Sequence, residues 1–452
     1  MSEDAPSSYP RFERGLLLAS TIPPDAERWW KHDHRTGLWA TPAINNSRVR
    51  EPLPETQTQW KTITFPRNDL KDLRPDQERA CEAWKENRRG VIVMATGTGK
   101  TEVAFHLVRE IASHTLFVAP TRALAYQLAA RIESAFGVDV GFIGDHTFRL
   151  RPICVTTYQS AGIKMEHLGD YFKLLVFDEC HHLPGDLTGD AARMSAAPYR
   201  LGLTATPIRT DGRHNEYDEL IGPVCHEFSI AAARESVLAD YRIQRIPVFL
   251  TDDEQAEYDR LGEVVRKHML IGRENDPTYD WEKVSRNIGR DPDAWHAFYA
   301  RLKRRSIEEH ATAKLDVLED LFREHMQQVV VFTGSNIMAR AVSTRFLIPC
   351  LLAHSRTKER EFVLRGYEEG RFKTIVANRV LNEGVDVPAA KVGIVIGGTG
   401  SEREAVQRLG RILRKKGVQA ATLYEVVCAE TGEEMRSRKR RRNDAYQRRS
   451  AL

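Results

Sequence analysis

The chain has 452 residues, a formal net charge of +4, 41% hydrophobic residues and 29% charged residues. This length predicts about three domains, and the composition is typical of a soluble globular protein and excludes a largely disordered chain. No stretch approaches the roughly 18 consecutive apolar residues of a membrane-spanning helix, and the N-terminus lacks a signal peptide, so we expect no membrane association.

Six cysteines are scattered along the chain without a C-x-x-C pair. This spacing argues against a disulfide framework and against an iron–sulfur cluster. We therefore expect a cytoplasmic protein with reduced cysteines.

Residues 1–64 are rich in proline and tryptophan. Trp29, Trp30, Trp39 and Trp60 are four of the seven tryptophans in the chain. So many large aromatic side chains predict a small ordered module. The tryptophans either form its core or stack on nucleic-acid bases, and we favour the core.

Residues 65–235 alternate strand-like and helix-like stretches, which is typical of parallel βα units. The predicted strands are 91–94, 115–119, 139–143, 153–156, 174–177 and 200–203. A glycine-rich turn follows the first strand and precedes a helix-like run. In this context its backbone N–H groups and the helix N-terminus bind phosphate, although Met94 replaces the first glycine of the strict P-loop pattern. The predicted nucleotide contacts are Thr96, Gly97, Thr98, Gly99, Lys100 and Thr101.

Within this P-loop, Lys100 is predicted to reach the β- and γ-phosphates and Thr101 to ligate Mg²⁺. A second motif, Asp178-Glu179, ends the strand 174–177. Carboxylates at the carboxyl end of a parallel strand lie at the ligand-binding edge of an open sheet. We expect Asp178 to hold Mg²⁺ and Glu179 to activate the attacking water, so the two motifs together predict ATP hydrolysis. Cys180-His181-His182 could suggest zinc, but no second Cys/His cluster supplies further ligands.

Residues 236–310 are rich in charged and aromatic residues, with helix-like stretches at 252–269 and 292–310. They predict a helical insertion without strands. Residues 311–434 resume the βα alternation without a second P-loop, which predicts a nucleotide held between two lobes. The predicted strands of this second lobe are 329–332, 351–353, 374–377, 392–396 and 421–426.

The positive charge is concentrated in residues 435–452, which hold eight Lys or Arg residues and one Asp. Such a tail is either solvated and disordered or a nucleic-acid contact.

The motifs resemble those of superfamily 2 helicases, in the same order. Residues 73–77 resemble the adenine-binding element, which implies nucleotide contacts by Arg74 and Gln77. Residues 119–124 and 155–159 resemble strand-contacting elements, and residues 203–207 resemble the link between hydrolysis and strand movement. The resemblance therefore implies nucleic-acid contacts by Thr121, Arg122, Thr156 and Thr157, and coupling roles for Thr204 and Thr206.

In the second lobe, residues 377–388 and 407–414 resemble motifs five and six. This implies nucleotide contacts by Gly384 and Asp386, and catalytic roles for Gln407, Arg411 and Arg414. An arginine delivered from the opposite lobe neutralises charge on the γ-phosphate and is worth roughly 10³–10⁵ in rate. It also makes hydrolysis depend on lobe closure.

Within this superfamily the chain is similar to the XPB-type DNA repair helicases, through residues 205–213, 220–223, 388–404 and 423–427. The resemblance implies an α/β fold of two RecA-like parallel-sheet lobes with a helical, thumb-like insertion and an N-terminal domain. It also implies a strand-separating Arg-Glu-Asp element. Here Arg209-Thr210-Asp211 lacks the central acid, so we expect translocation to be better preserved than unwinding. The N-terminal 64 residues are short for a damage-recognition domain.

The resulting hypothesis is an ATP- and Mg²⁺-dependent DNA helicase or translocase that acts in DNA repair. Its expected partners are single-stranded or forked duplex DNA and a nuclease or other repair protein, and we expect a monomer. Two alternatives stay open. One is an RNA-dependent ATPase on the same fold, and the other is a nucleic-acid-binding scaffold switched by ATP.

Overall fold

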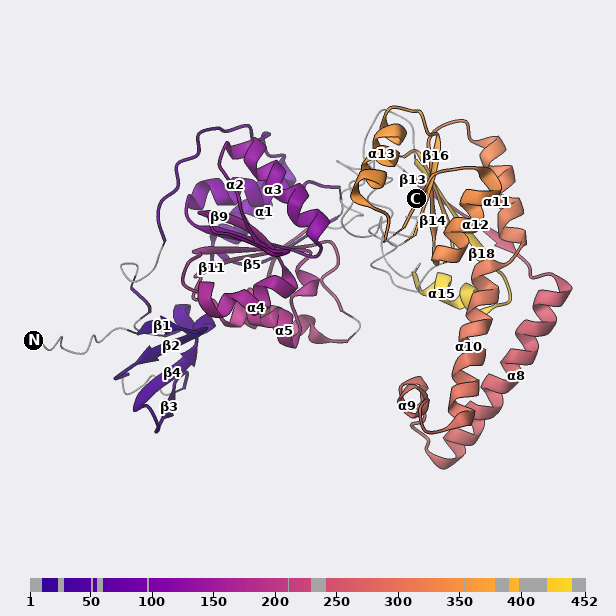
Figure 1. The fold of residues 1–452 in the computed structure, drawn as a ribbon, viewed down its shortest axis with the longest axis horizontal. Helices are drawn as coiled ribbons and strands as arrows, with labels where there is room; N and C mark the ends of the chain where they lie inside the picture. Colours follow the sequence, from indigo (N-terminus) through magenta and orange to yellow (C-terminus); the bar gives the residue numbers. More distant parts are fainter. Residues whose placement is uncertain are drawn as a thin grey trace, which may run out of the picture. The chain divides into compact units, whose positions relative to one another are not determined.

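The structure is a computed structural model that describes residues 10–22, 28–49, 52–54, 60–95, 97–209, 211–228, 241–352, 354–378, 390–397 and 421–440. The chain divides near residue 236 into two compact units, each built around a parallel α/β sheet (Figure 1). Within the described ranges, no helix is both long enough and apolar enough to cross a membrane. All six cysteine thiols are free.

A small antiparallel sheet precedes the first lobe. Its strand order is β1 (Arg11–Glu13), β2 (Leu16–Ala19), β4 (Leu38–Pro42) and β3 (Lys31–Asp33). Trp30 lies in its buried core, and Trp29 and Trp39 pack against that core, which confirms the predicted packing role for these three side chains. Trp60 lies apart, with the Lys173 ammonium 5.9 Å from its ring centroid.

This N-terminal module packs directly on the first lobe. Ala196 of the lobe belongs to the same buried core cluster as Trp30. The Asn46 side-chain amide donates to the Ala196 carbonyl at 2.9 Å. Gly169 must be small, because a Cβ there would lie 2.6 Å from the Phe12 ring. The first lobe and the module therefore share a packed interface.

The sheet of the first lobe has the strand order β12-β5-β11-β10-β6-β9-β7-β8. In the described part of this lobe only β8 is antiparallel to its neighbour, and the other pairs are parallel. All six predicted strands are present, and β8 and β12 are additional. The bounds are β5 (Arg89–Met94), β6 (Thr115–Ala119), β7 (Gly141–Gly144), β8 (Thr147–Arg149), β9 (Ile153–Thr157), β10 (Leu174–Asp178), β11 (Tyr199–Thr204) and β12 (Val224–Phe228).

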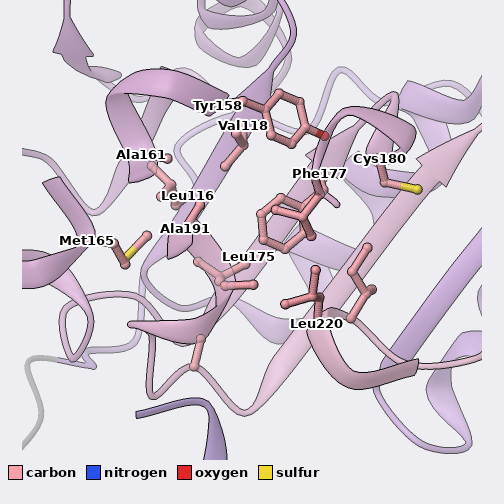
Figure 2. Close-up of a cluster of buried hydrophobic side chains, with 14 of the residues drawn as sticks. Leu116, Val118, Tyr158, Ala161, Met165, Leu175, Phe177, Cys180, Ala191 and Leu220 are labelled. Atoms are coloured by element: carbon pink, nitrogen blue, oxygen red, sulfur yellow. The ribbon is translucent and has the colours of Figure 1, made fainter. Parts of the chain in front are cut away.

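Helices cover both faces of this sheet (Figure 1). They are α1 (Pro75–Lys85), α2 (Lys100–Ile111), α3 (Arg122–Phe136), α4 (Tyr158–Leu168), α5 (Asp186–Arg193) and α6 (Tyr217–Leu220). Figure 2 shows one core layer, in which Leu175 and Phe177 of β10 meet Met165 of α4 and Ala191 of α5. Burying a leucine or phenylalanine side chain fully contributes about 1.5–3 kcal/mol to the stability of the fold. This layer therefore holds β10 in place, and with it Asp178 at the end of the strand.

The second unit holds a parallel sheet with the strand order β13-β18-β17-β14-β16-β15. Its strands are β13 (Tyr241–Val248), β14 (Val329–Thr333), β15 (Cys350–Leu351), β16 (Thr374–Ala377), β17 (Val392–Ile396) and β18 (Ala421–Cys428). Strand β13 corrects the prediction that residues 236–310 contain no strand. Its sequence, Tyr-Arg-Ile-Gln-Arg-Ile-Pro-Val, alternates only over its first four residues, and Pro247 is tolerated because β13 is an edge strand.

A helical hairpin follows β13 and projects from the second unit (Figure 1). It consists of α8 (Asp252–Asn275), α9 (Trp281–Asn287) and α10 (Pro292–His310), so both predicted helical stretches are confirmed. Thr251 and Glu254 form a capping box at the start of α8. The remaining helices of the described part are α11 (Ala313–Glu324), α12 (Asn336–Phe346), α13 (Thr357–Glu368) and α15 (Gly432–Arg440).

Helix α15 also corrects the expected start of the basic tail. Residues 435–440 belong to this helix, and Ser437 is fully buried. Its hydroxyl donates to Glu425 of β18 at 2.7 Å. The tail prediction for residues 441–452 lies outside the described residues.

Candidate nucleotide and nucleic-acid sites

The P-loop joins β5 to α2, and its glycines adopt conformations that favour glycine. Gly97 has φ +86° and Gly99 has φ +83°. A Cβ on Gly99 would lie 2.5 Å from the Nε2 atom of Gln77. Helix α2 begins at Lys100, with Thr101 in its first turn. The turn therefore presents the positive end of a 12-residue helix, which is a site for an anion such as phosphate.

Two residues that are predicted to contact the nucleotide also shape this loop. Thr98 is fully buried, and its hydroxyl donates to the Ala95 carbonyl at 2.6 Å, so a contact with phosphate would come from its backbone N–H, which stays a prediction. The Gln77 amide donates to the carbonyls of Thr98 and Gly99 at 3.0 and 3.2 Å. Its oxygen accepts from the backbone N–H of Arg74 at 3.0 Å. The adenine-binding element and the P-loop are thus one hydrogen-bonded unit.

Arg74 lies in the same unit, where its guanidinium donates to the Thr98 carbonyl and pairs with Asp76 at 3.0 Å. The role of Arg74 and Gln77 in binding a base stays a prediction.

The acidic motif lies beside the P-loop lysine. The Lys100 ammonium is 3.3 Å from Glu179 Oε1, and these side chains are only 10% and 15% exposed. Glu179 has φ +48°, a strained conformation for a residue with a side chain. Burial, and then the neighbouring Glu179 carboxylate, raise the pKa of Asp178 to about 6. The geometry brings together a cation for phosphate and two adjacent carboxylates.

A threonine hydroxyl and a carboxylate are the oxygen donors that Mg²⁺ prefers, so Thr101 and Asp178 fit the ion chemically. A bound cation would also favour the charged form of Asp178.

His181 connects the acidic motif to β11. Its ring is fully buried, and its Nδ1 atom lies 3.4 Å from Glu179 Oε2 and 3.2 Å from the Thr204 hydroxyl. The Thr204 hydroxyl in turn accepts from the backbone N–H of Thr206 at 3.1 Å. Thr204 and Thr206, which are predicted to couple hydrolysis to movement, are therefore connected to Glu179 by the ring of His181. The sequence alone assigned no role to this histidine.

The Arg209-Thr210-Asp211 element is tied to the same motif. Arg209 pairs with Asp211 through two hydrogen bonds, of 2.5 and 2.9 Å, and its guanidinium also donates to the His181 carbonyl. These hydrogen bonds hold the pKa of the Asp211 carboxyl well below its usual range. The predicted role of Arg209 and Asp211 in strand separation stays a prediction.

A separate hollow of about 320 Å³ lies where α3 and α4 begin. Thr121 caps α3 by accepting from the Leu124 N–H, and Thr157 caps α4 by accepting from the Ser160 N–H. Two helix N-termini therefore meet at one hollow, and both favour an anion. The lining residues are Pro120, Thr121, Arg122, Thr157, Tyr158, Gln159, His182 and Thr188.

Three of the four predicted nucleic-acid contacts line this hollow, and Thr156 does not. Thr156 is 1% exposed, and its hydroxyl donates to the Ile143 carbonyl at 2.6 Å. Alternation along β9 explains the difference, because successive side chains point to opposite faces of the sheet. The structure also adds Tyr158, whose hydroxyl donates to the Asp178 carbonyl at 2.8 Å and so connects the hollow to the acidic motif.

The remaining predicted site residues lie outside the described residues. They are Thr96, Gly384, Asp386, Gln407, Arg411 and Arg414.

A P-loop after β5, an acidic motif at the end of β10, which β11 separates from β5, and a second parallel α/β unit define a P-loop nucleoside triphosphatase of the superfamily 2 helicase class. Two family models match the chain. The model described as "Type III restriction enzyme, res subunit" matches residues 70–209, and the model described as "ERCC3/RAD25/XPB C-terminal helicase" matches residues 298–447.

Curated relatives identify the family. The "DNA 3'-5' translocase XPB2" of Sulfurisphaera tokodaii is 36% identical over 441 residues, which cover 96% of this chain and 99% of that protein. The "DNA 3'-5' helicase XPB" of Kineococcus radiotolerans is 27% identical over 79% of this chain and 60% of its own length. The chain belongs to the XPB family of superfamily 2 DNA helicases and translocases, which use ATP.

A solved structure supports the fold. The helicase domain of Hef from Pyrococcus furiosus matches with a TM-score of 0.52 and 19% identity, covering 81% of this chain and 98% of that one.

Proposed function

We propose that this chain hydrolyses ATP with Mg²⁺ to move along DNA with 3'-5' polarity, as the name of the Sulfurisphaera tokodaii relative states for that protein. The proposal rests mainly on the contact between Lys100 and Glu179. Because ATP phosphates would attract the ammonium, nucleotide binding would release Glu179 to act on water. A scaffold that only binds ATP has no need for such a carboxylate.

The hollow at α3 and α4 supports a nucleic-acid backbone as the second ligand. Its two capped helix N-termini and Arg122 suit phosphate, and contacts with phosphate carry no sequence information. We therefore propose sequence-independent strand binding by Thr121, Arg122 and Thr157. We also propose a repair role in the cytoplasm beside a nuclease or other repair partner.

The test is ATP turnover of the full chain with single-stranded DNA, forked duplex, blunt duplex and single-stranded RNA in parallel. We expect stimulation by DNA and not by RNA. Lys100→Ala and Glu179→Gln should each lower turnover at least about a hundredfold, whereas the surface variant Glu166→Gln should resemble the wild type. Undiminished turnover in Lys100→Ala and Glu179→Gln would contradict ATP hydrolysis at this site, and stimulation by RNA alone would contradict the DNA substrate.

Polarity needs a separate measurement. Streptavidin bound to a biotin at the 5' end of an oligonucleotide should be displaced in an ATP-dependent manner, and streptavidin at the 3' end should remain bound. The reverse pattern would contradict 3'-5' movement.

A further inference from the structure

An acidic hairpin turn contacts the arginine of the hollow. Strands β7 and β8 are joined by Asp145 and His146, which have φ +52° and +59°, as in a two-residue type I′ turn. This turn brings the Asp145 carboxylate to the first turn of α3. Asp145 Oδ1 lies 2.5 Å from Arg122 Nη1.

The same carboxylate has a second partner on α3. Its Oδ2 atom accepts from the Tyr126 hydroxyl at 3.0 Å. Tyr126 lies four residues after Arg122, so both project from one side of the helix. The Tyr126 ring stacks on Phe142 of β7, with centroids 4.3 Å apart and planes 7° apart. Packing thus fixes the hairpin against α3 and holds the carboxylate beside the arginine.

The ion pair is accessible to water. The Arg122 side chain is 67% exposed and that of Asp145 is 27% exposed. Exposed pairs of this kind are weak, so a phosphate in the hollow can replace Asp145 on the guanidinium. Asp145 would then be a negative charge close to a negatively charged ligand.

We propose that Asp145 competes with a nucleic-acid phosphate for Arg122 and thereby limits how tightly the first lobe holds the strand. This inference rests on the strand-binding role that is proposed for the hollow. A translocase must release its strand in every cycle. A carboxylate of the same chain that competes for the arginine shortens the lifetime of the protein–strand complex, while the phosphate contact can still form. In this proposal Asp145 sets the affinity for the strand and does not touch ATP.

Asp145→Asn tests the charge with little change in shape. Asparagine tolerates the left-handed conformation of residue 145 and keeps an oxygen that accepts hydrogen bonds. The matched control is Asp139→Asn, which removes the same charge from the same lobe. Asp139 pairs with Arg149 and Arg151 and does not line the hollow. Thermal unfolding verifies that each variant is folded.

The measurement is the Kd of a fluorescein-labelled oligothymidylate of roughly 20 nucleotides without ATP. We expect Asp145→Asn to bind about three- to tenfold more tightly at low salt, and Asp139→Asn to bind like the wild type. The gain should shrink as salt rises, because exposed charges are screened. Arg122→Gln should bind more weakly, and the double variant Asp145→Asn/Arg122→Gln should bind no better than Arg122→Gln.

The outcomes separate the two proposals. If Arg122→Gln weakens binding and Asp145→Asn leaves it unchanged or weakens it, Asp145 only orients the arginine and the competition is overturned. If Asp145→Asn and Asp139→Asn tighten binding equally, the effect is one of general charge, and the inference is also overturned. If Arg122→Gln binds like the wild type, the hollow is not the strand site, and both proposals for it fail while the ATPase proposal stands.

Discussion

The Nδ1 atom of His181 lies 3.2 Å from the hydroxyl oxygen of Thr204. The same nitrogen lies 3.4 Å from Glu179 Oε2, and the Thr204 hydroxyl is bonded to the backbone of Thr206. A movement of Glu179 would therefore be passed to the end of β11 through a single buried ring. The arrangement provides a direct connection between the hydrolysis site and the segment that continues to Arg209.

Removing this ring should affect coupling more than hydrolysis. We expect His181→Ala to retain DNA-independent ATP turnover within about tenfold, because Lys100 and Glu179 remain, and to lose most of the stimulation by DNA. ATP turnover with and without single-stranded DNA measures both quantities. His167→Ala, which changes an exposed histidine at the end of α4 that does not line the hollow, is the comparison. Equal loss of basal and stimulated turnover in His181→Ala would show that the ring supports chemistry instead.

Gln77 should control nucleotide affinity through the shape of the P-loop. Its amide donates to the Thr98 and Gly99 carbonyls, so Gln77→Ala removes the side-chain donor of Gly99 and leaves Arg74 as the side-chain donor to Thr98. We expect the KM for ATP to rise about tenfold, or about 1.4 kcal/mol, with a smaller change in kcat. Steady-state kinetics provide the measurement, with Gln327→Ala in the second unit as the control. An unchanged KM would mean that the loop holds its shape without Gln77.

The buried ion pair of the second unit should dominate its stability. Lys314 and Glu433 are 0% and 2% exposed, with Nζ and Oε2 2.7 Å apart. Breaking a buried pair leaves one charge uncompensated, so Lys314→Met should destabilise this unit by about 3–5 kcal/mol. Hydrogen exchange of α11 and α15 under mild denaturant measures the loss.

The exposed pair Arg323–Glu319, with side chains 72% and 39% exposed, provides the control. Arg323→Met should change stability by less than about 1 kcal/mol. Similar losses for Lys314→Met and Arg323→Met would contradict the importance of burial.

Arg200 should hold the surface on which the N-terminal module packs. It is fully buried, and its guanidinium donates to the carbonyls of Ala192, Ser195, Ala197 and Leu220. Lysine has no planar fork of donors, so Arg200→Lys should lose most of these bonds and lower the melting temperature by several degrees. We expect Trp30 fluorescence to change first, because Ala196 belongs to its core. If fluorescence and secondary structure are lost at the same temperature, the module does not loosen before the protein unfolds, and the prediction is contradicted.

Much of the first lobe and its nucleotide site could be predicted because the signals are local. Short apolar runs followed by glycines or carboxylates specify strands and the turns after them, and parallel strands bring those turns to one edge. The six predicted strands and the neighbouring positions of Lys100 and Glu179 follow from this. Strand β13 was missed because its alternation covers only residues 241–244 and lies beside a highly charged helical segment that dominates the composition.

The sequence alone determined the fold class, the order of the motifs and the nucleotide chemistry, since each depends on residues close together in the chain. Tertiary structure decided which side chains face a ligand and which face the core. Thr156 is buried by the pleat of β9, Thr98 and Gln77 are engaged in shaping the P-loop, and His181 gains a role because β10 and β11 lie side by side. The Asp145–Arg122 pair likewise depends on a hairpin packed against α3. Contacts between residues that are distant in sequence depend on packing, so a local sequence pattern does not predict them.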